Sequence, residues 1–268
     1  MMKLMYLTAD PEAATQAIEA GVDRVFVDLE YIKKAERQRG RNTLISHNTI
    51  DDVHRVRAVV PEGQLLVRIN PINPATDSEV DEVLSAGADI VMVPMVMDAD
   101  DVRRFVESVA GRAHTCVLYE TAQSLVRMDA MLDVPGVDEV YIGLNDLHIS
   151  MALDFMFELL SGGVIDYMAA KVTSRGIPFG FGGVARIGEG TLPAEVILGE
   201  HYRLGSSSVI LSRTFRGEVG LHSGPVDLCA EIARLRAREE EISGWSEADF
   251  ETNRAVVRRQ VAQIVSGA

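Results

Sequence analysis

Short apolar runs rich in β-branched residues recur along the chain and alternate with longer amphipathic segments. The segments between the runs open with Asp and further acidic residues, as in "DPEAATQAIEAG" and "DADDVRRFVESVAG", and most end at glycine. These start and stop signals predict capped helices. The apolar runs predict eight strands, over residues 4–9, 24–30, 65–70, 90–96, 115–120, 139–144, 178–183 and 207–213.

Eight strand–helix repeats in 268 residues predict an α/β fold, and we expect a (β/α)8 TIM barrel whose strands are buried on both faces. A doubly wound open sheet is the alternative, because closure of a sheet cannot be read from one sequence. Residues 31–49 form a basic insertion after the second strand, expected as a flexible loop or lid at the carboxyl face.

The carboxyl-terminal residues carry a helical pattern of their own. Residues 246–268 show an apolar stripe at helical spacing, which predicts one extra helix beyond a catalytic barrel domain of residues 1–245. Such a stripe must be buried, either on its own barrel or on a neighbouring subunit. We favour the neighbour, so the helix is expected to be swapped between subunits of a homo-oligomer.

Composition and charge narrow the possible partners. The net charge of −14 argues against nucleic acid or an anionic membrane surface, since both would be repelled. Cys116 and Cys229 lie far apart without metal-site spacing, so neither a disulfide framework nor a zinc site is predicted. An acidic residue and a proline within the first eleven positions argue against a signal peptide. A cytoplasmic protein is expected.

Four charged residues interrupt or end the apolar runs: Glu30, Arg68, Glu120 and Asp146. In a barrel the carboxyl ends of the strands form the active-site face, so these side chains are expected to share a pocket. Glu120 and Asp146 follow consecutive strands, and two adjacent carboxylates need a proton or a cation between them. A hard divalent ion such as Mg2+ or Mn2+ suits such ligands.

Each of these residues also has a purely structural interpretation. Asp146 could cap a helix that begins near Leu147, and Glu120 could pair with Arg68. Arg68 is costly to bury unpaired, so it either pairs with structural acids or binds a substrate carboxylate through two hydrogen bonds. We favour substrate binding, because arginine suits planar anions.

The motifs "VDLE", "VRIN", "AGADIVMVPMV", "YET" and "VDEVYIGLNDLHISM", one βα unit apart, resemble the HpcH/HpaI aldolase and citrate lyase family. The 2-keto-3-deoxy acid aldolase branch is the most similar, and the clear resemblance covers roughly residues 20 to 152. It implies a TIM barrel of trimer-based homo-oligomers, trimers or hexamers, that exchange a carboxyl-terminal helix.

The resemblance also implies roles for particular residues. Glu120 and Asp146 would bind a divalent metal, Mg2+ or Mn2+ with Co2+ as a further option. Arg68 would hold the carboxylate or enolate oxygen of pyruvate or a related 2-keto acid, and Asn145 and Leu144 are expected to contact that substrate. Glu30 is expected behind the ligands, ordering metal-bound water.

The chemistry of the residues agrees with these roles. Cleavage of a carbon–carbon bond next to a carbonyl needs an electron sink, which a metal chelated by a 2-keto acid supplies. The lysines Lys3, Lys33, Lys34 and Lys171 lie away from carboxyl-terminal strand ends, which argues against a Schiff base.

The residue that would act as general base does not stand at the position that the resemblance implies. The family carries a His almost directly after the second-strand motif, whereas this chain reads "EYIKK", so His47 beyond the insertion is the candidate base. A solvated loop residue or a helix cap is the alternative for His47. His148 is expected to pack or to hydrogen-bond locally. Leu118 departs from the family, where a polar residue precedes the metal-binding Glu, and this puts the substrate range in doubt.

Glycine- and serine-rich stretches at residues 180–190 and 203–209 suggest an anionic substrate tail at the last two strands. The function we infer is a metal-dependent carbon–carbon lyase, a class II type aldolase acting on a 2-keto acid. Two alternatives stay open: a lyase for a CoA thioester of the citryl-CoA or malyl-CoA type, and a non-catalytic or regulatory barrel.

Overall fold

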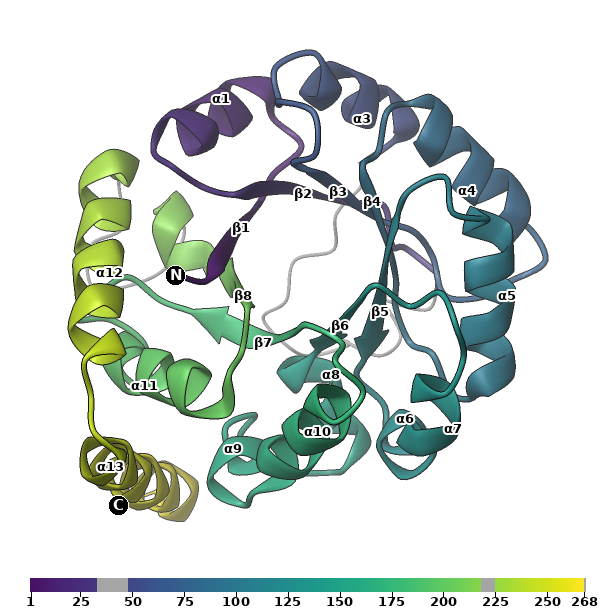
Figure 1. Ribbon diagram of the computed structural model, residues 1–268. Coiled ribbons are helices and arrows are strands. Elements are labelled where there is room, and N and C mark those ends of the chain that lie inside the picture. The colour runs from purple at the N-terminus through teal and green to yellow at the C-terminus, as the bar shows by residue number, and fades with distance from the viewer. Residues whose placement is uncertain (33–47, 218–224, 268) are drawn as a thin grey trace.

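The computed structural model describes residues 1–32, 48–217 and 225–267, and within them eight parallel strands close into one barrel. Each strand pairs with the next in the chain, and β1 pairs with β8, so the predicted TIM barrel is confirmed and the open sheet is wrong. Figure 1 shows the strands surrounded by a ring of helices. The strands are β1 (Lys3–Leu7), β2 (Arg24–Asp28), β3 (Leu65–Arg68), β4 (Ile90–Val93), β5 (His114–Tyr119), β6 (Glu139–Ile142), β7 (Phe179–Val184) and β8 (Ser208–Leu211).

Several of the helices begin at a residue whose side chain caps the first turn. The side chain of Asp98, for example, accepts hydrogen bonds from the backbone N–H groups of Asp100 and Asp101 at the start of α5. The described helices are α1 (Pro11–Glu19), α3 (Ile50–Arg57), α4 (Thr76–Ser85), α5 (Ala99–Val109), α6 (Ala122–Val126), α7 (Met128–Leu132), α8 (Leu144–Ser150), α9 (Glu158–Ser161), α10 (Val164–Thr173), α11 (Ala194–Leu204), the 3-10 helix η1 (Arg213–Arg216), α12 (Leu228–Ser243) and α13 (Glu247–Ser266).

Alternate residues of each strand face the helices and the barrel interior. Val25 and Val27 of β2 belong to the large core between strands and helices, whereas Phe26 between them faces inward. The interior is apolar at mid-height, so the barrel is a packed core rather than a pore. Its buried residues there are Met5, Phe26, Leu66, Ile90, Met92, Cys116, Leu118 and Tyr141.

Charged and polar groups close the amino-terminal end of the barrel. Arg24 and Glu139 form a buried ion pair of 2.8 Å, and Ser208 donates a hydrogen bond of 3.2 Å to the same carboxylate. Tyr141 holds the one irregular strand pair, because its hydroxyl donates to the carbonyl of Gly182 (2.6 Å) and accepts from the N–H of Ile210 (2.9 Å). Buried polar contacts therefore fill the amino-terminal end of the barrel.

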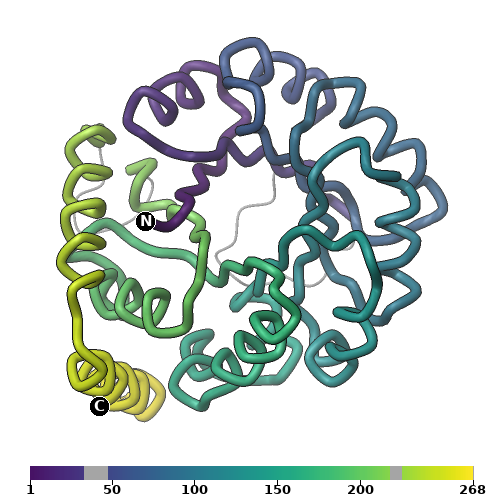
Figure 2. Tube along the Cα trace, viewed as in Figure 1, coloured from purple at the N-terminus to yellow at the C-terminus, as the bar shows by residue number. Residues whose placement is uncertain are grey.

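The carboxyl-terminal helix α13 starts at the capping residue Ser246 and packs against α11 and α9 of its own chain. In Figure 2 it lies outside the ring, beside α11. Val257 and Val261 are buried there, and Asn253 donates to the carbonyl of Val196 and to Glu200, both at 3.0 Å. Exchange of this helix between subunits stays a prediction. No helix of the described ranges has both the length and the apolar character for a bilayer crossing.

Candidate active site

Two carboxylates meet at the carboxyl end of neighbouring strands. Glu120 directly follows β5, and Asp146 lies in the first turn of α8, four residues after the end of β6. The two strands are hydrogen-bonded neighbours, and their pairing continues where the N–H of Gly143 donates to the carbonyl of Tyr119 at 3.0 Å. The predicted proximity of the two acids follows from this pairing.

Gly143 explains why the apolar run of β6 breaks where it does. A Cβ at this position would lie 2.7 Å from Oε2 and 2.8 Å from Cβ of Glu120. Carbon atoms do not approach so closely without displacement. The absent side chain therefore leaves the space that the Glu120 side chain occupies.

Glu120 is a buried acid, and one of its oxygens is held by a backbone N–H group. Only 3 % of the residue is exposed, and its Oε1 accepts a hydrogen bond of 3.1 Å from the N–H of Met95. Met95, in the "VPMV" motif, has a left-handed backbone with φ of 57°, unusual for a residue with a side chain. Burial raises the pKa of Glu120 well above its ordinary value, the neighbouring charge of Asp146 raises this pKa further, and Arg68 opposes both.

Asp146 does not act as the helix cap that its position allowed. Helix α8 begins at Leu144 with Gly143 as its N-cap, so the interpretation of Asp146 as a cap is wrong. Its Oδ1 is buried and accepts no hydrogen bond from any residue that the structure describes. A buried carboxylate oxygen without a donor is costly, and a cation between Asp146 and Glu120 would satisfy it.

Arg68 ends β3 and is held by two acids of the neighbouring strand and its extension. Its Nε and Nη2 each donate to Asp28 at 2.8 Å, and Nη2 also lies 3.3 Å from Oε2 of Glu30. The guanidinium lies over the Phe26 ring, 5.5 Å from its centroid. Burial alone lowers the pKa of Arg68, but Asp28 and Glu30 outweigh this effect and raise the pKa.

These contacts bear on two interpretations of the sequence. Asp28 makes the bidentate contact with Arg68 through Nε and Nη2, as expected for pairing with structural acids, and substrate binding by Arg68 stays a prediction. Glu120 forms no ion pair with Arg68 in the part of the chain that the structure describes, although it feels the positive charge of Arg68. Sequence analysis missed Asp28, and its signal was the alternation in "VDLE", which puts Asp28 and Glu30 on the same strand face.

The charges around the site suit a hard cation. The carboxylates of Asp28, Glu30 and Glu120 act on the guanidinium of Arg68. The charges of Asp146, Arg68 and Glu30 in turn act on the pKa of Glu120. Among the described residues no cluster of three or more His, Cys, Asp or Glu could hold a metal. As a pair of oxygen ligands, Glu120 and Asp146 would suit Mg2+ or Mn2+, which accept few protein ligands and leave positions for water and substrate. The role of Glu30 in ordering metal-bound water stays a prediction.

The other predicted residues take separate positions. Leu144 is 1 % exposed and packs over Gly182 of β7, where a Cβ would lie 2.7 Å from its Cδ1. Asn145 is partly exposed in the first turn of α8. The local role of His148 is confirmed, since its Nδ1 lies 3.2 Å from the carbonyl of Leu144 one helical turn earlier. His47 lies outside the described residues, so its role as base stays a prediction.

The glycine- and serine-rich stretches do not form one anion site. Ser207 and Ser208 lie at the amino end of β8, opposite the carboxylates, where Ser207 donates to the carbonyl of Phe179 at 2.9 Å. Arg186, after β7, is paired with Glu189 at 2.7 Å. The second stretch therefore lies away from the carboxyl ends of the strands, and an anionic substrate tail beside residues 180–190 stays a prediction. Leu118 faces the barrel interior below Glu120 and is 3 % exposed.

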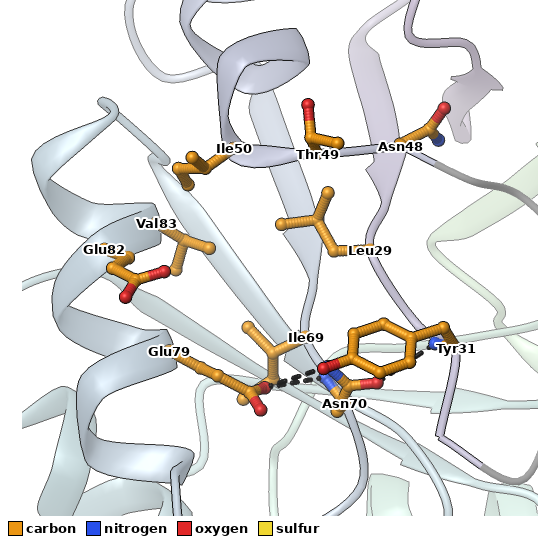
Figure 3. A pocket seen from close by; sticks show the side chains of 10 residues that line it. All are labelled: Leu29, Tyr31, Asn48, Thr49, Ile50, Ile69, Asn70, Glu79, Glu82 and Val83. Atoms are coloured by element: carbon orange, nitrogen blue, oxygen red, sulfur yellow. Dashed lines mark hydrogen bonds between the residues drawn. The ribbon is translucent and has the colours of Figure 1, made fainter.

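A cavity of about 270 Å³ lies on the helix side of the same strand ends. Figure 3 shows it bounded by Leu29 and Ile69 and by residues of α3 and α4. Leu29 and Ile69 directly follow Asp28 and Arg68, so they lie on the opposite face of the strand ends. Neither metal-binding candidate lines it. The wall between this cavity and the barrel mouth is made by the ends of β2 and β3.

Comparison with known proteins gives one family and one recurrent fold. Residues 3–155 match the family described as HpcH/HpaI aldolase/citrate lyase. A 2-keto-3-deoxy-L-rhamnonate aldolase of Escherichia coli O17:K52:H18 is 32 % identical over 39 % of this chain and 50 % of its own length. The chain thus spans about half the length of the curated relatives it matches.

Two solved structures share the fold over most of the chain. One is an HpcH/HpaI aldolase/citrate lyase family protein from Burkholderia cenocepacia J2315, with a TM-score of 0.60 and 17 % identity, covering 90 % of this chain and 94 % of the other. The second is the citrate synthase SbnG, with a TM-score of 0.62 and 15 % identity, covering 88 % and 94 %. At such identity these structures establish the architecture and not the reaction.

Proposed function

The chain belongs to the HpcH/HpaI aldolase/citrate lyase family, and from this premise we propose that it is a metal-dependent carbon–carbon lyase of the aldolase type acting on a 2-keto acid. The family and the names of its relatives support a lyase. The observation that carries the finer proposal is the carboxylate pair of buried Glu120 and partly buried Asp146. The buried Oδ1 of Asp146 has no donor among the described residues, and the charge of Asp146 raises the pKa of Glu120.

Glu120 and Asp146 would hold the ion, Mg2+ or Mn2+. When bound, the ion supplies Lewis acidity for a negative charge that develops on the substrate oxygen. Gly143 gives the Glu120 side chain its space, and the N–H of Met95 fixes one of its oxygens. Asp146 supplies the second carboxylate of the pair. Its Oδ1 accepts no hydrogen bond from the described residues, so a cation could bind this oxygen without displacing a donor.

Arg68 would orient the substrate through Nη1. Asp28 and Glu30 hold the other side of the guanidinium, so its plane is fixed before a substrate arrives. A positioned cation costs no reorganisation when charge develops on the substrate. The apolar layer of Leu118 and Met92 below the site excludes water from beneath the reacting atoms. His47 is the proposed base.

The names of the relatives favour a 2-keto acid with a sugar-derived tail as substrate, because the Escherichia coli relative is a 2-keto-3-deoxy-L-rhamnonate aldolase. Because only half of that protein is matched, this substrate class is part of the proposal. Pyruvate is the fragment common to aldol cleavage of such acids, and it is therefore the probe of choice.

The test is exchange of the methyl protons of pyruvate for deuterium, followed by NMR in D2O with Mg2+. We expect exchange by the wild type, its loss on adding a chelator, and its loss in Asp146→Ala. Asp154→Ala is the matched control, since Asp154 is an exposed acid eight residues further on. Exchange of acetyl-CoA protons instead would favour the CoA-thioester lyase, and exchange with neither compound would favour a non-catalytic barrel.

A further inference from the structure

Asn70 lies two residues beyond Arg68 and connects the ends of β2 and β3. It is 4 % exposed, and its Oδ1 accepts two backbone hydrogen bonds of 3.0 Å, from the N–H groups of Tyr31 and Ile32. Figure 3 shows Asn70 between the backbone of Tyr31 and the carboxylate of Glu79. One side chain thus ties the segment after β2 to the strand that carries Arg68.

Asn70 is itself held in place by helix α4. Its backbone N–H and its Nδ2 both donate to Oε2 of Glu79 at 3.2 Å, and the other oxygen of Glu79 accepts from Nδ2 of Asn73 at 3.0 Å. Because Glu79 takes both the amide and the backbone donor, the orientation of the Asn70 side chain is set, with Oδ1 toward Tyr31. The anchor is therefore built on a rigid helix.

Glu30 lies between two fixed points as a result. On one side its N–H donates to Oδ1 of Asp28 at 3.1 Å, and on the other side it is followed directly by Tyr31, whose N–H is held by Asn70. The carboxylate of Glu30 is 1 % exposed and reaches Nη2 of Arg68. We propose that Asn70 is a positioning residue that holds Glu30 against Arg68 and so sets the guanidinium for the keto acid, an inference that rests on the proposed function.

Side-chain packing restrains Tyr31 only weakly. The Tyr31 residue is 64 % exposed, and the cavity of about 270 Å³ lies beside it. Without the Asn70 oxygen, the backbone at Tyr31 can shift toward this space, and Glu30 would move with it. With Glu30 displaced, the guanidinium of Arg68 would be less well placed to bind the keto acid.

The test compares Asn70→Ala with Asn73→Ala. Both variants remove an asparagine amide that binds Glu79, but only Asn70 touches the backbone after Glu30. In the pyruvate exchange assay we expect Asn70→Ala to raise KM by about tenfold. We expect kcat to change little, because the contact with Arg68 is weakened equally in the bound substrate and in the transition state. We expect Asn73→Ala to keep the wild-type KM while lowering Tm to a similar extent.

Equal KM values for Asn70→Ala and the wild type, or an equal rise in both variants, would overturn the inference. A crystal structure of Asn70→Ala gives a measurement independent of activity, namely the distance from Oε2 of Glu30 to Nη2 of Arg68. An increase from 3.3 Å is expected, and an unchanged distance refutes the positioning role. Absence of exchange in the wild type would instead count against the proposed function alone.

Discussion

Asp28 grips Arg68 through two parallel hydrogen bonds of 2.8 Å, from directly paired positions of β2 and β3. Such a two-pronged pair fixes both the position and the plane of the guanidinium. Both residues are largely buried, with side-chain exposures of 3 % for Asp28 and 13 % for Arg68. The positively charged guanidinium of Arg68 is thus held in a fixed position in the barrel wall.

Replacing Asp28 with Asn should destabilise the protein, because the buried guanidinium loses its main charged partner. We expect Asp28→Asn to lower the free energy of unfolding by about 3 kcal/mol, as for other buried pairs that lose one member. Urea unfolding measures this change. Asp77→Asn is the control, since Asp77 pairs with Arg104 on the surface and should change the free energy by less than about 1 kcal/mol. Equal effects of both variants would contradict the account.

Adding a methyl group at Gly143 should push Glu120 out of place. The Cβ of Gly143→Ala would lie 2.7 Å from Oε2 of Glu120, so we expect Mn2+ affinity to fall by at least about tenfold. Gly244→Ala is the matched control, because its Cβ would meet only the carbonyl of Glu241, at 3.5 Å. Calorimetric titration with Mn2+ compares the two variants. Unchanged affinity in Gly143→Ala would mean that Glu120 is not a ligand.

Removing one charge of the carboxylate pair should stabilise the metal-free protein. Burial and the charge of Asp146 raise the pKa of Glu120, which reflects the cost of keeping both acids together. In chelator, Asp146→Asn is therefore expected to gain about 1 kcal/mol in the free energy of unfolding, as is common when a functional site is relieved. A loss of stability in the same experiment would show that Asp146 is a structural residue.

His201 should make stability depend on pH. Burial lowers the pKa of His201 to about 3, and the ring is stacked on Phe181 at 3.8 Å. The unfolded chain takes up this proton near pH 6.5 and the folded chain does not, so the contribution of neutral His201 is complete above pH 6.5 and is lost as the pH falls toward 3. In His201→Gln the fall in unfolding free energy between pH 6 and 4 should be shallower by up to about 1.4 kcal/mol per pH unit. Parallel curves for both proteins would contradict this assignment.

Much of the fold could be read from the sequence, because strand and helix periods differ and capping residues mark the helix starts. Closure of the barrel could not be read from the sequence, because it depends on the pairing of β1 with β8, which lie far apart in the chain. The positions of Glu120 and Asp146 were predictable because both follow consecutive strands. The ion pair between Arg68 and Asp28 was not predictable, because several acids could have paired with Arg68. Only the register of β2 and β3 puts Asp28 opposite Arg68.

The contacts of Gly143 and Asn70 also could not be predicted from the residues next to them in the sequence. A glycine in an apolar run gives no sign that a carboxylate on the next strand fills its place. Likewise, the asparagine in "VRIN" shows no partner until the chain after β2 comes back to β3. Contacts between segments more than about 20 residues apart are set by the barrel and not by local pattern.

The central claim is that Glu120 and Asp146 hold a divalent metal to which a 2-keto acid binds. Its most direct test is calorimetric titration of Mn2+ into chelator-stripped protein, for the wild type and Asp146→Ala, with and without pyruvate. We expect the wild type to bind Mn2+, pyruvate to tighten this binding, and Asp146→Ala to lose both effects. A wild type that binds no metal, or an Asp146→Ala variant that binds Mn2+ as tightly as the wild type, would contradict the claim.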